Sequence, residues 1–232
     1  MKLLALDTSS DACSVAVRMD DDCHLQHVCE PRAHARLILP MIEQALQHSG
    51  LTLAGLDAIA FGRGPGSFTG LRIAAGIVQG LALAADKPVL PISTLAAIAQ
   101  QAHAEQAADQ VLVASDARMG EVYWGAFVVQ DGIMQLQGEE QVLDPALAPL
   151  PKAESGMWTA AGTGWAAYAE QLLPRFQTRL SNVHAELEPQ ADYLSLLAAR
   201  AWQQGLAVSA EQAQPVYLRN KVAQTLRERG VR

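Results

Sequence analysis

The chain has 232 residues, half of them hydrophobic, and a formal net charge of −7 at pH 7. This length accommodates one large domain or two smaller ones, and the apolar content excludes a globally disordered chain. The negative charge argues against a protein that grips nucleic acid by itself, because that mode of binding depends on neutralising phosphates.

Three strands are predicted at the start of the chain, over Leu3–Asp7, Cys13–Arg18 and Cys23–Cys29. Polar turn residues separate them, and the second turn is an acidic triplet over 20–22, which is typical of hairpins. Asp7 closes the first apolar run, so we expect a carboxylate at a strand end and no secretory signal.

A helix is predicted over 34–49, where apolar residues recur at i, i+3 and i+4. Pro40 lies inside it and predicts either a kink or a helix that begins at this residue. A short apolar strand over 57–61 comes next and leads into the most informative stretch of the chain.

That stretch is the glycine loop, Gly62-Arg63-Gly64-Pro65-Gly66-Ser67-Phe68-Thr69-Gly70-Leu71-Arg72. Glycine suits a backbone that turns with positive φ or approaches another group closely, and Ser67 or Thr69 can cap the helix predicted over 67–85. The loop therefore resembles a phosphate cradle at a helix N-terminus, although the Gly-Lys-Ser/Thr of a Walker A loop is missing. A tight strand-to-helix turn without any ligand is the other interpretation.

Small residues recur every four positions in two rows along this helix: Gly66, Gly70 and Ala74, then Gly76, Gly80 and Ala84. A glycine inside a helix costs about 1 kcal/mol relative to alanine, so close packing must offset it. One row has to pack on the protein's own sheet, and the second favours a contact with another molecule. The predicted contact residues, on this helix and the preceding one, are Gly70, Leu71, Ala74, Ile77, Val78, Ile38 and Met41.

The second half of the chain repeats the first. After a strand over Val89–Ile92 and a helix over 93–104, the predicted elements are strands over Val111–Ser115, Val122–Val129, Ile133–Leu136 and Met157–Ala161, and helices over 165–173 and 193–204. Asp116 closes the strand Val111–Ser115 as Asp7 closes the first strand. Gly162-Thr163-Gly164 opens a helix as the glycine loop does.

Two such units, each βββαβαβα with a mixed central sheet, indicate an α/β fold of two ribonuclease-H-like lobes, as in the actin, sugar-kinase and Hsp70 ATPases. We place the boundary in the polar stretch 105–109. It gives an N-terminal lobe over 1–106, which would carry the partner interface, and a C-terminal lobe over 107–232.

In ATPases of this fold the two acidic turns face a cleft and hold Mg²⁺ and phosphates. The loop residues that would face such a cleft are Asp7, Thr8, Ser9, Gly64, Gly66, Ser67, Asp116, Arg118, Gly162 and Gly164. Neither acidic turn has the glycine that lets backbone N–H groups close on phosphate, so we expect a vestigial site without a cofactor or catalytic residues. An ATPase or phosphotransferase using Asp7, Asp116, Gly64 and Gly164 is the alternative.

No metal site or nucleophile is predicted. His24 and His27 point to opposite faces of their strand, no His-x-x-x-His pair occurs, and neither Gly-x-Ser-x-Gly nor a cysteine beside a base is present. The odd count of three cysteines suits free thiols in a reducing cytosol. No apolar run reaches the ~18 residues of a membrane span, so we expect a cytoplasmic protein.

The end of the chain is basic. Between 217 and 232 five basic residues stand against Glu228, which gives this segment +4 and leaves −11 for the rest of the chain. The tail Arg219–Arg232 is therefore either a solvated end or an RNA contact.

Five segments together resemble the bacterial TsaB (YeaZ) family. They are 4–16, 62–72, Asp116–Trp124, Gly162–Trp165 and Pro215–Asn220, and they span nearly the whole chain. The resemblance implies a non-catalytic paralogue of TsaD, which binds TsaD in a heterodimer and forms a homodimer when alone. With the small ATPase TsaE, that complex forms N6-threonylcarbamoyladenosine beside the anticodon of tRNAs that read ANN codons, so the tail would meet tRNA within the complex.

The resemblance also implies how the two paralogues differ. TsaD holds its metal through a His-x-x-x-His element after a strand like Val89–Ile92. Here Thr94 and Ile98 stand at the corresponding positions, and neither side chain can hold a transition metal. The resemblance therefore implies a scaffold rather than an enzyme.

Overall fold

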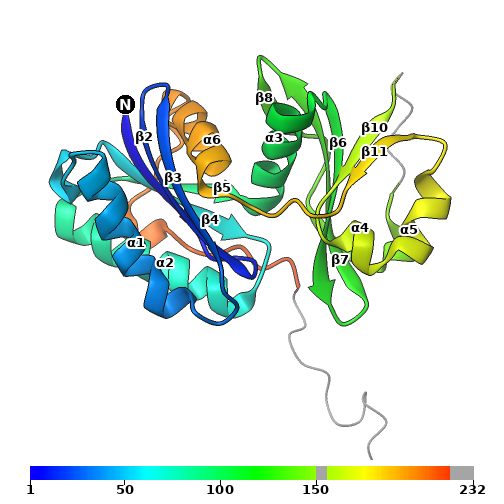
Figure 1. The fold of residues 1–232 in the computed structure, drawn as a ribbon, viewed down its shortest axis with the longest axis horizontal. Helices are drawn as coiled ribbons and strands as arrows, with labels where there is room; N and C mark the ends of the chain where they lie inside the picture. Colours follow the sequence, from blue (N-terminus) through cyan, green and yellow to red (C-terminus); the bar gives the residue numbers. More distant parts are fainter. Residues whose placement is uncertain (150–155, 220–232) are drawn as a thin grey trace, which may run out of the picture.

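The computed structural model describes residues 1–149 and 156–219, which form two α/β lobes side by side (Figure 1). The first eight elements are β1 Lys2–Asp7, β2 Ala12–Met19, β3 Asp22–Cys29, α1 His34–His48, β4 Ala58–Gly64, α2 Phe68–Ala85, β5 Val89–Ser93 and α3 Thr94–Gln106. They are followed by β6 Gln110–Arg118, β7 Glu121–Gln130, β8 Ile133–Leu136, β9 Gln141–Leu143, β10 Trp158–Ala161, α4 Gly164–Ala167, α5 Ala169–Phe176, β11 Leu180–His184 and α6 Ala191–Gln203. Short 3₁₀ turns cover Leu53–Gly55, Pro145–Leu147 and Ala210–Gln212.

The two sheets have the same strand order and the same strand directions. The first sheet runs β3-β2-β1-β4-β5, and the second runs β8-β7-β6-β10-β11, with the additional short strand β9 also paired with β7. In the first sheet β1, β2 and β3 are antiparallel neighbours, while β4 and β5 lie parallel to β1. In the second sheet β6, β7 and β8 are antiparallel neighbours, while β10 and β11 lie parallel to β6. This repetition confirms the predicted pair of ribonuclease-H-like lobes.

Helices cover both faces of each sheet, but two of them cover a sheet from the other half of the sequence. Helices α1 and α2 pack on one face of the first sheet, and α6, although it comes after the second sheet in the chain, packs on the other face. Helix α3 packs mainly on the second sheet and against α6, while α4 and α5 cover the far face of that sheet. The predicted boundary between 106 and 107 falls between α3 and β6.

The second unit differs from the predicted βββαβαβα pattern between its third and fourth strands. Within the described residues, 137–149 and 156–157, this connection holds β9 and a 3₁₀ turn where the first unit has α1. Two prolines only four residues apart, at 145 and 149, disfavour a helix here, because each removes a backbone donor, whereas α1 accommodates its single Pro40. The edge strand β11 is mostly exposed and polar, so it lacks the apolar alternation that predicts a strand.

Most of the other predicted elements are confirmed within two residues, but the single helix predicted over 165–173 is wrong, because two helices, α4 and α5, meet there at Tyr168. Helix α1 is continuous through Pro40, so it neither begins nor ends there. Helix α2 is capped by Ser67, whose side chain accepts a hydrogen bond from the Gly70 amide at 3.4 Å, as predicted. The acidic triplet forms the tight turn between β2 and β3, with Asp20 at a φ of 54°.

Candidate functional site

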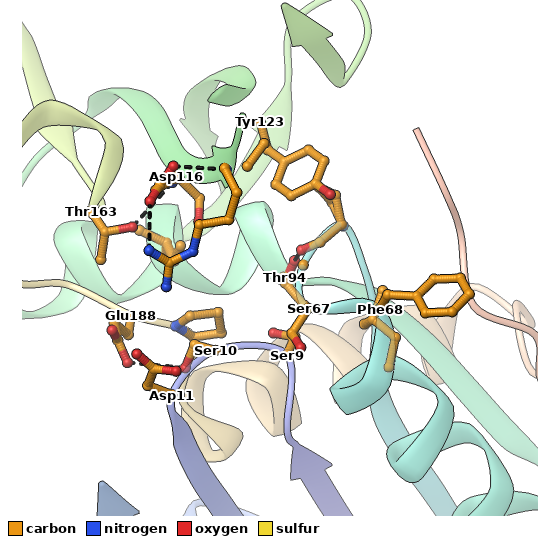
Figure 2. Close-up of a pocket in the computed structure, with 18 of the residues that line it drawn as sticks. Ser9, Ser10, Asp11, Ser67, Phe68, Thr94, Asp116, Tyr123, Thr163 and Glu188 are labelled. Atoms are coloured by element: carbon orange, nitrogen blue, oxygen red, sulfur yellow. Dashed lines mark hydrogen bonds and ion pairs between the residues drawn. The ribbon is translucent and has the colours of Figure 1, made fainter. Parts of the chain in front are cut away.

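A cleft of about 640 Å³ lies between the lobes, where loops of both sheets meet. From the first lobe it is lined by the β1–β2 turn, the glycine loop and the start of α3. From the second lobe it is lined by the end of β6, Thr163 and the linker before α6. Figure 2 shows Ser10, Asp11 and Glu188 facing Asp116 and Thr163 across this cleft.

The structure brings half of the predicted loop residues to the cleft wall and places the others beneath it. Ser9, Gly66, Ser67, Asp116 and Arg118 line the cleft, and Thr163 joins them between Gly162 and Gly164. Asp7, at the end of β1, and Thr8, in the β1–β2 turn, are buried. The two acidic turns and the two glycine loops therefore meet around one cleft.

The glycine loop is joined directly to the β1–β2 turn. The Ser67 amide donates to the Ser9 carbonyl at 2.7 Å, and the Thr8 hydroxyl donates to the Gly70 carbonyl at 2.7 Å. A Cβ at position 66 would lie 2.6 Å from the Ser9 carbonyl oxygen, and one at position 70 would overlap the Thr8 carbonyl oxygen. These glycines are thus required by the protein's own backbone, as in the interpretation of a turn without a ligand.

Asp7 lies in the interior next to Gly62. It is 1 % exposed, and its Oδ1 accepts hydrogen bonds from the amide and the hydroxyl of Ser9, both at 2.8 Å. Its Oδ2 has no hydrogen-bond partner among the described residues and occupies the place of a Cβ at Gly62. Burial raises the pKa of Asp7 to about 7, although the hydrogen bonds from Ser9 oppose this shift.

Asp116 closes its own turn in the same way but lies at the cleft surface. Its Oδ1 accepts from the Arg118 amide at 2.8 Å and from the Tyr168 hydroxyl at 3.0 Å, and its Oδ2 pairs with the Arg118 guanidinium at 3.2 Å. The Thr163 hydroxyl accepts from the Asp116 amide. Both oxygens of this carboxylate already have partners from the chain.

The second glycine loop also packs on its own lobe. Gly162 has a φ of 102°, and a Cβ at either Gly162 or Gly164 would lie within 3.0 Å of the Ala114 carbonyl oxygen on β6. The two halves of the cleft therefore follow one plan, in which glycines let a strand-to-helix loop approach the first strand of its sheet.

The cleft surface carries more carboxylates than free cations among the residues described. Asp11, Asp116 and Glu188 line it, and the Ser10 hydroxyl donates to Glu188 at 3.0 Å. Of the lining arginines, Arg118 pairs with Asp116 and Arg219 pairs with Glu121. Across 1–149 and 156–219, no group of three histidine, cysteine, aspartate or glutamate residues could hold a metal ion. Thr94 and Ile98 line the cleft on one side of α3.

Six of the seven predicted partner contacts face the interior, which corrects that prediction. Gly70 packs on Thr8, and the side chains of Leu71, Ala74 and Val78 are buried against the first sheet, together with Ile38 and Met41 of α1. Only Ile77 is partly exposed. Of the two rows of small residues, the row with Gly66, Gly70 and Ala74 packs within the N-terminal lobe.

The second row, Gly76, Gly80 and Ala84, faces outward. Among the described residues nothing lies within 4 Å of a Cβ built at Gly76 or Gly80, and Leu83 beside them is 61 % exposed. Among the described helices, α2 alone is long and apolar enough to cross a membrane by length and composition, and 33 % of it is buried. Helix α1 lies beside α2 (Figure 1), and its Leu39 is also exposed. These exposed apolar or small residues of the two helices, Leu39, Gly76, Gly80, Leu83 and Ala84, are called the α1/α2 face below.

A segment that the sequence did not predict as part of the cleft also lines it. Val216, Tyr217, Leu218 and Arg219 run along the cleft, after the last 3₁₀ turn. Of the predicted RNA-contacting tail, only Arg219 is described, and residues 220–232 lie outside the described part of the chain. Pro215–Asn220 contributes to the family resemblance, but nothing in its sequence predicts this position, because it has no periodicity and its partners lie far away in the sequence.

Comparisons with known proteins give consistent matches. The family model for "TsaD: tRNA N6-adenosine threonylcarbamoyltransferase" matches residues 29–227. The tRNA threonylcarbamoyladenosine biosynthesis protein TsaB of Escherichia coli (strain K12) is 42 % identical over 225 residues, covering 96 % of both chains. The protein of the same name from Haemophilus influenzae is 43 % identical over 232 residues, covering 96 % of this chain and 95 % of the other.

Solved structures match over the same extent. A Pseudomonas aeruginosa protein described as similar to peptidase YEAZ superposes with a TM-score of 0.89 at 49 % identity, covering 94 % of this chain and 99 % of that one. YeaZ from Pseudomonas aeruginosa superposes with a TM-score of 0.85 at 47 % identity, with the same coverage.

Proposed function

This chain belongs to the TsaB family of tRNA threonylcarbamoyladenosine biosynthesis proteins, and on that premise we propose that it is a non-catalytic scaffold that binds and supports TsaD. In this proposal TsaD transfers the threonylcarbamoyl group, and the present chain contributes a surface. The observation that carries the proposal is the α1/α2 face, whose glycines contact no other part of the described chain.

The outward glycines support a close helix–helix contact. Gly76 and Gly80 each cost the helix about 1 kcal/mol relative to alanine, and no described residue packs against them. A partner helix can approach such a surface closely. The match to the TsaD family model includes residues 34–85, so TsaD has a counterpart of α1 and α2 that can pair with this face.

The cleft supports the non-catalytic half of the proposal. The β1–β2 turn occupies the inner side of the glycine loop, where a phosphate cradle would need free amides. Asp7 is buried against Gly62, and the carboxylate of Asp116 is already paired with Arg118. Thr94 and Ile98 line the cleft but offer no metal-ligating atoms suited to a transition metal.

The same proposal covers the other members of the assembly and its location. We expect TsaE to join the complex, a homodimer through the α1/α2 face when TsaD is absent, and contact with ANN-decoding tRNAs through the complex. The N-terminal lobe, 1–106, would make these protein contacts, and the C-terminal lobe, 107–232, would support the cleft. Since tRNA is modified in the cytoplasm, we place the protein there.

Co-purification with TsaD tests the scaffold. The full chain carrying Gly80→Arg places a long charged side chain on the α1/α2 face, and Gln171→Arg places the same side chain on exposed α5 of the other lobe. We expect Gly80→Arg to remain folded by circular dichroism. Its affinity for TsaD should fall roughly tenfold or more, since burying an unpaired charge in an apolar contact costs more than about 1.4 kcal/mol. Gln171→Arg should retain TsaD. Full recovery of TsaD by a folded Gly80→Arg variant would remove this face from the proposal.

Calorimetry with Mg·ATP tests the alternative of an ATPase or phosphotransferase. We expect the isolated chain to give no binding heat and no phosphate release. Turnover that Asp7→Asn and Asp116→Asn abolish would instead assign catalysis to these two turns.

A further inference from the structure

We propose that residues 216–219 form a strap that ties the two lobes together across the mouth of the cleft and holds them at a fixed angle. This inference does not depend on the proposed function. It rests on three sets of contacts that a single extended segment makes with both lobes.

The first set fixes the strap to the glycine loop. The Val216 amide donates to the Arg63 carbonyl at 2.7 Å. Gly64 has a φ of 106°, and a Cβ at this position would lie 2.8 Å from the Val216 carbonyl oxygen. The loop therefore needs glycine at position 64 partly to admit the strap.

The second set fixes the strap to the start of α2. The Arg72 guanidinium lies 3.7 Å above the Phe68 ring, and its Nε donates to the Tyr217 hydroxyl at 3.1 Å. The rings of Phe68 and Tyr217 are 5.3 Å apart. The segment before the strap also follows this lobe, because Gln79 of α2 donates to the Ala213 carbonyl and Val208 pairs with Val89 of β5.

The third set crosses to the second lobe. The Arg219 guanidinium donates to the carbonyls of Ala117 and Arg118, at 3.1 and 3.2 Å, and pairs with the carboxylate of Glu121. The turn between β6 and β7 presents these carbonyls, since Arg118, Met119 and Gly120 all have positive φ. The Arg219 side chain is only 19 % exposed, so its ion pair is better shielded than a surface one.

The strap matters because the other crossings can act as hinges. The chain passes between the lobes from β5 to α3, which packs mainly on the second sheet, and from β11 to α6 (Figure 1). Two-lobed proteins close or open about such connections, and a third tie at the mouth of the cleft opposes that motion. Arg63 adds a further link between the lobes. Its guanidinium pairs with Glu140 of the second lobe at 3.4 Å, and its carbonyl accepts from the Val216 amide.

Hydrogen exchange on the full chain tests the strap. Arg219→Ala should increase the exchange rate of the Val216 amide roughly tenfold or more, because a charged hydrogen-bond network that held the segment is lost. Arg219→Lys should give an intermediate rate. Arg36→Ala, which removes an equal charge from the exposed pair with Glu30 on α1, should leave the rate unchanged.

Distance measurement tests the lobe angle. Spin labels at Gln203→Cys on α6 and Gln171→Cys on α5, with Cys23 and Cys29 changed to Ser, report the separation of the lobes. We expect Arg219→Ala to broaden the distance distribution and shift its mean, and Arg36→Ala to match the parent. If Arg219→Ala fails to fold, Glu121→Gln provides the same test by removing only the ion pair. An unchanged distribution together with unchanged exchange at Val216 in the folded variant would overturn the strap.

Discussion

On the inner face of α2, Gly70 lies so close to the β1–β2 turn that a Cβ would overlap the Thr8 carbonyl, whereas on the outer face Gly76 and Gly80 have open space beside them. The two faces have the same spacing of small residues in the sequence. The inner glycine is explained by the chain's own backbone, whereas no described residue packs against the outer glycines. Comparing the faces thus separates glycines needed for folding from glycines available for assembly.

The largest expected effect is on the inner face. Gly70→Ala should lower the free energy of unfolding by about 3 kcal/mol or more, because the overlapping atom is backbone and cannot move aside cheaply. Urea denaturation followed by circular dichroism measures this change. A Gly70→Ala protein as stable as the parent would contradict the close seating of α2.

The buried carboxylate at the same seat should give the next largest effect. The pKa of Asp7 is about 7 in the folded chain and 3.8 without the fold. Between these values the folded state keeps a proton that the unfolded state has released. The free energy of unfolding should therefore fall as pH rises from about 4 to about 7 and then level off. The fall should be on the order of 1.4 kcal/mol for each unit of pKa difference.

Asp7→Asn should remove this dependence and make the protein more stable than the parent at pH 8, since the amide oxygen can still accept from Ser9. Asp116→Asn is the matched control, because that carboxylate is paired with Arg118 and its loss should bring no gain. Parallel pH profiles of Asp7→Asn and the parent would show that burial of this carboxyl carries no penalty.

The outer face should respond to alanine in the opposite direction. Gly80→Ala should stabilise the isolated chain by about 0.5–1 kcal/mol, because alanine has the higher helix propensity and no described residue opposes the added methyl. The same change should weaken the contact with TsaD. Titration with TsaD measures the contact, and thermal unfolding measures the stability of the isolated chain, diluted until sedimentation shows a monomer so that the proposed homodimer does not contribute. A destabilised monomer would mean that the outer face already packs on something within the chain.

The smallest effect concerns the cap between the two faces. Ser67→Ala should cost about 0.5 kcal/mol, the low end for an N-cap, since the hydrogen bond to the Gly70 amide is long at 3.4 Å. Ser67→Asp should restore the stability. A loss as large as that of Gly70→Ala would mean that the cap, rather than the close packing, seats the helix.

Local patterns were sufficient for most of the fold. The apolar run before Asp7, the spacing in α1 and the cap at Ser67 each have a local physical cause, and the repeat of Asp7 in Asp116 predicted the second lobe. The edge strand β11 has no such cause, because its side chains are largely exposed and its partner β10 alone determines its conformation. The packing of α6 on the first sheet likewise depends on tertiary contacts, because the apolar spacing of α6 does not specify which sheet it covers.

The site was less predictable for a related reason. Gly66, Gly70 and Ala74 look like Gly76, Gly80 and Ala84 in sequence, and only the position of Thr8 decides which row is covered. The link from Arg219 to Glu121 joins residues about a hundred positions apart, without a motif that relates them. Spacing along one helix predicts what kind of surface forms, but not which side of the molecule receives it.

The hydrogen bond from the Thr8 hydroxyl to the Gly70 carbonyl holds the first turn of α2 against the sheet before any partner arrives. An association that uses the opposite side of this helix then needs little ordering of the backbone, so it should proceed as rigid docking with a small entropic penalty. Loosening this one anchor would slow recognition without altering any atom that touches the partner.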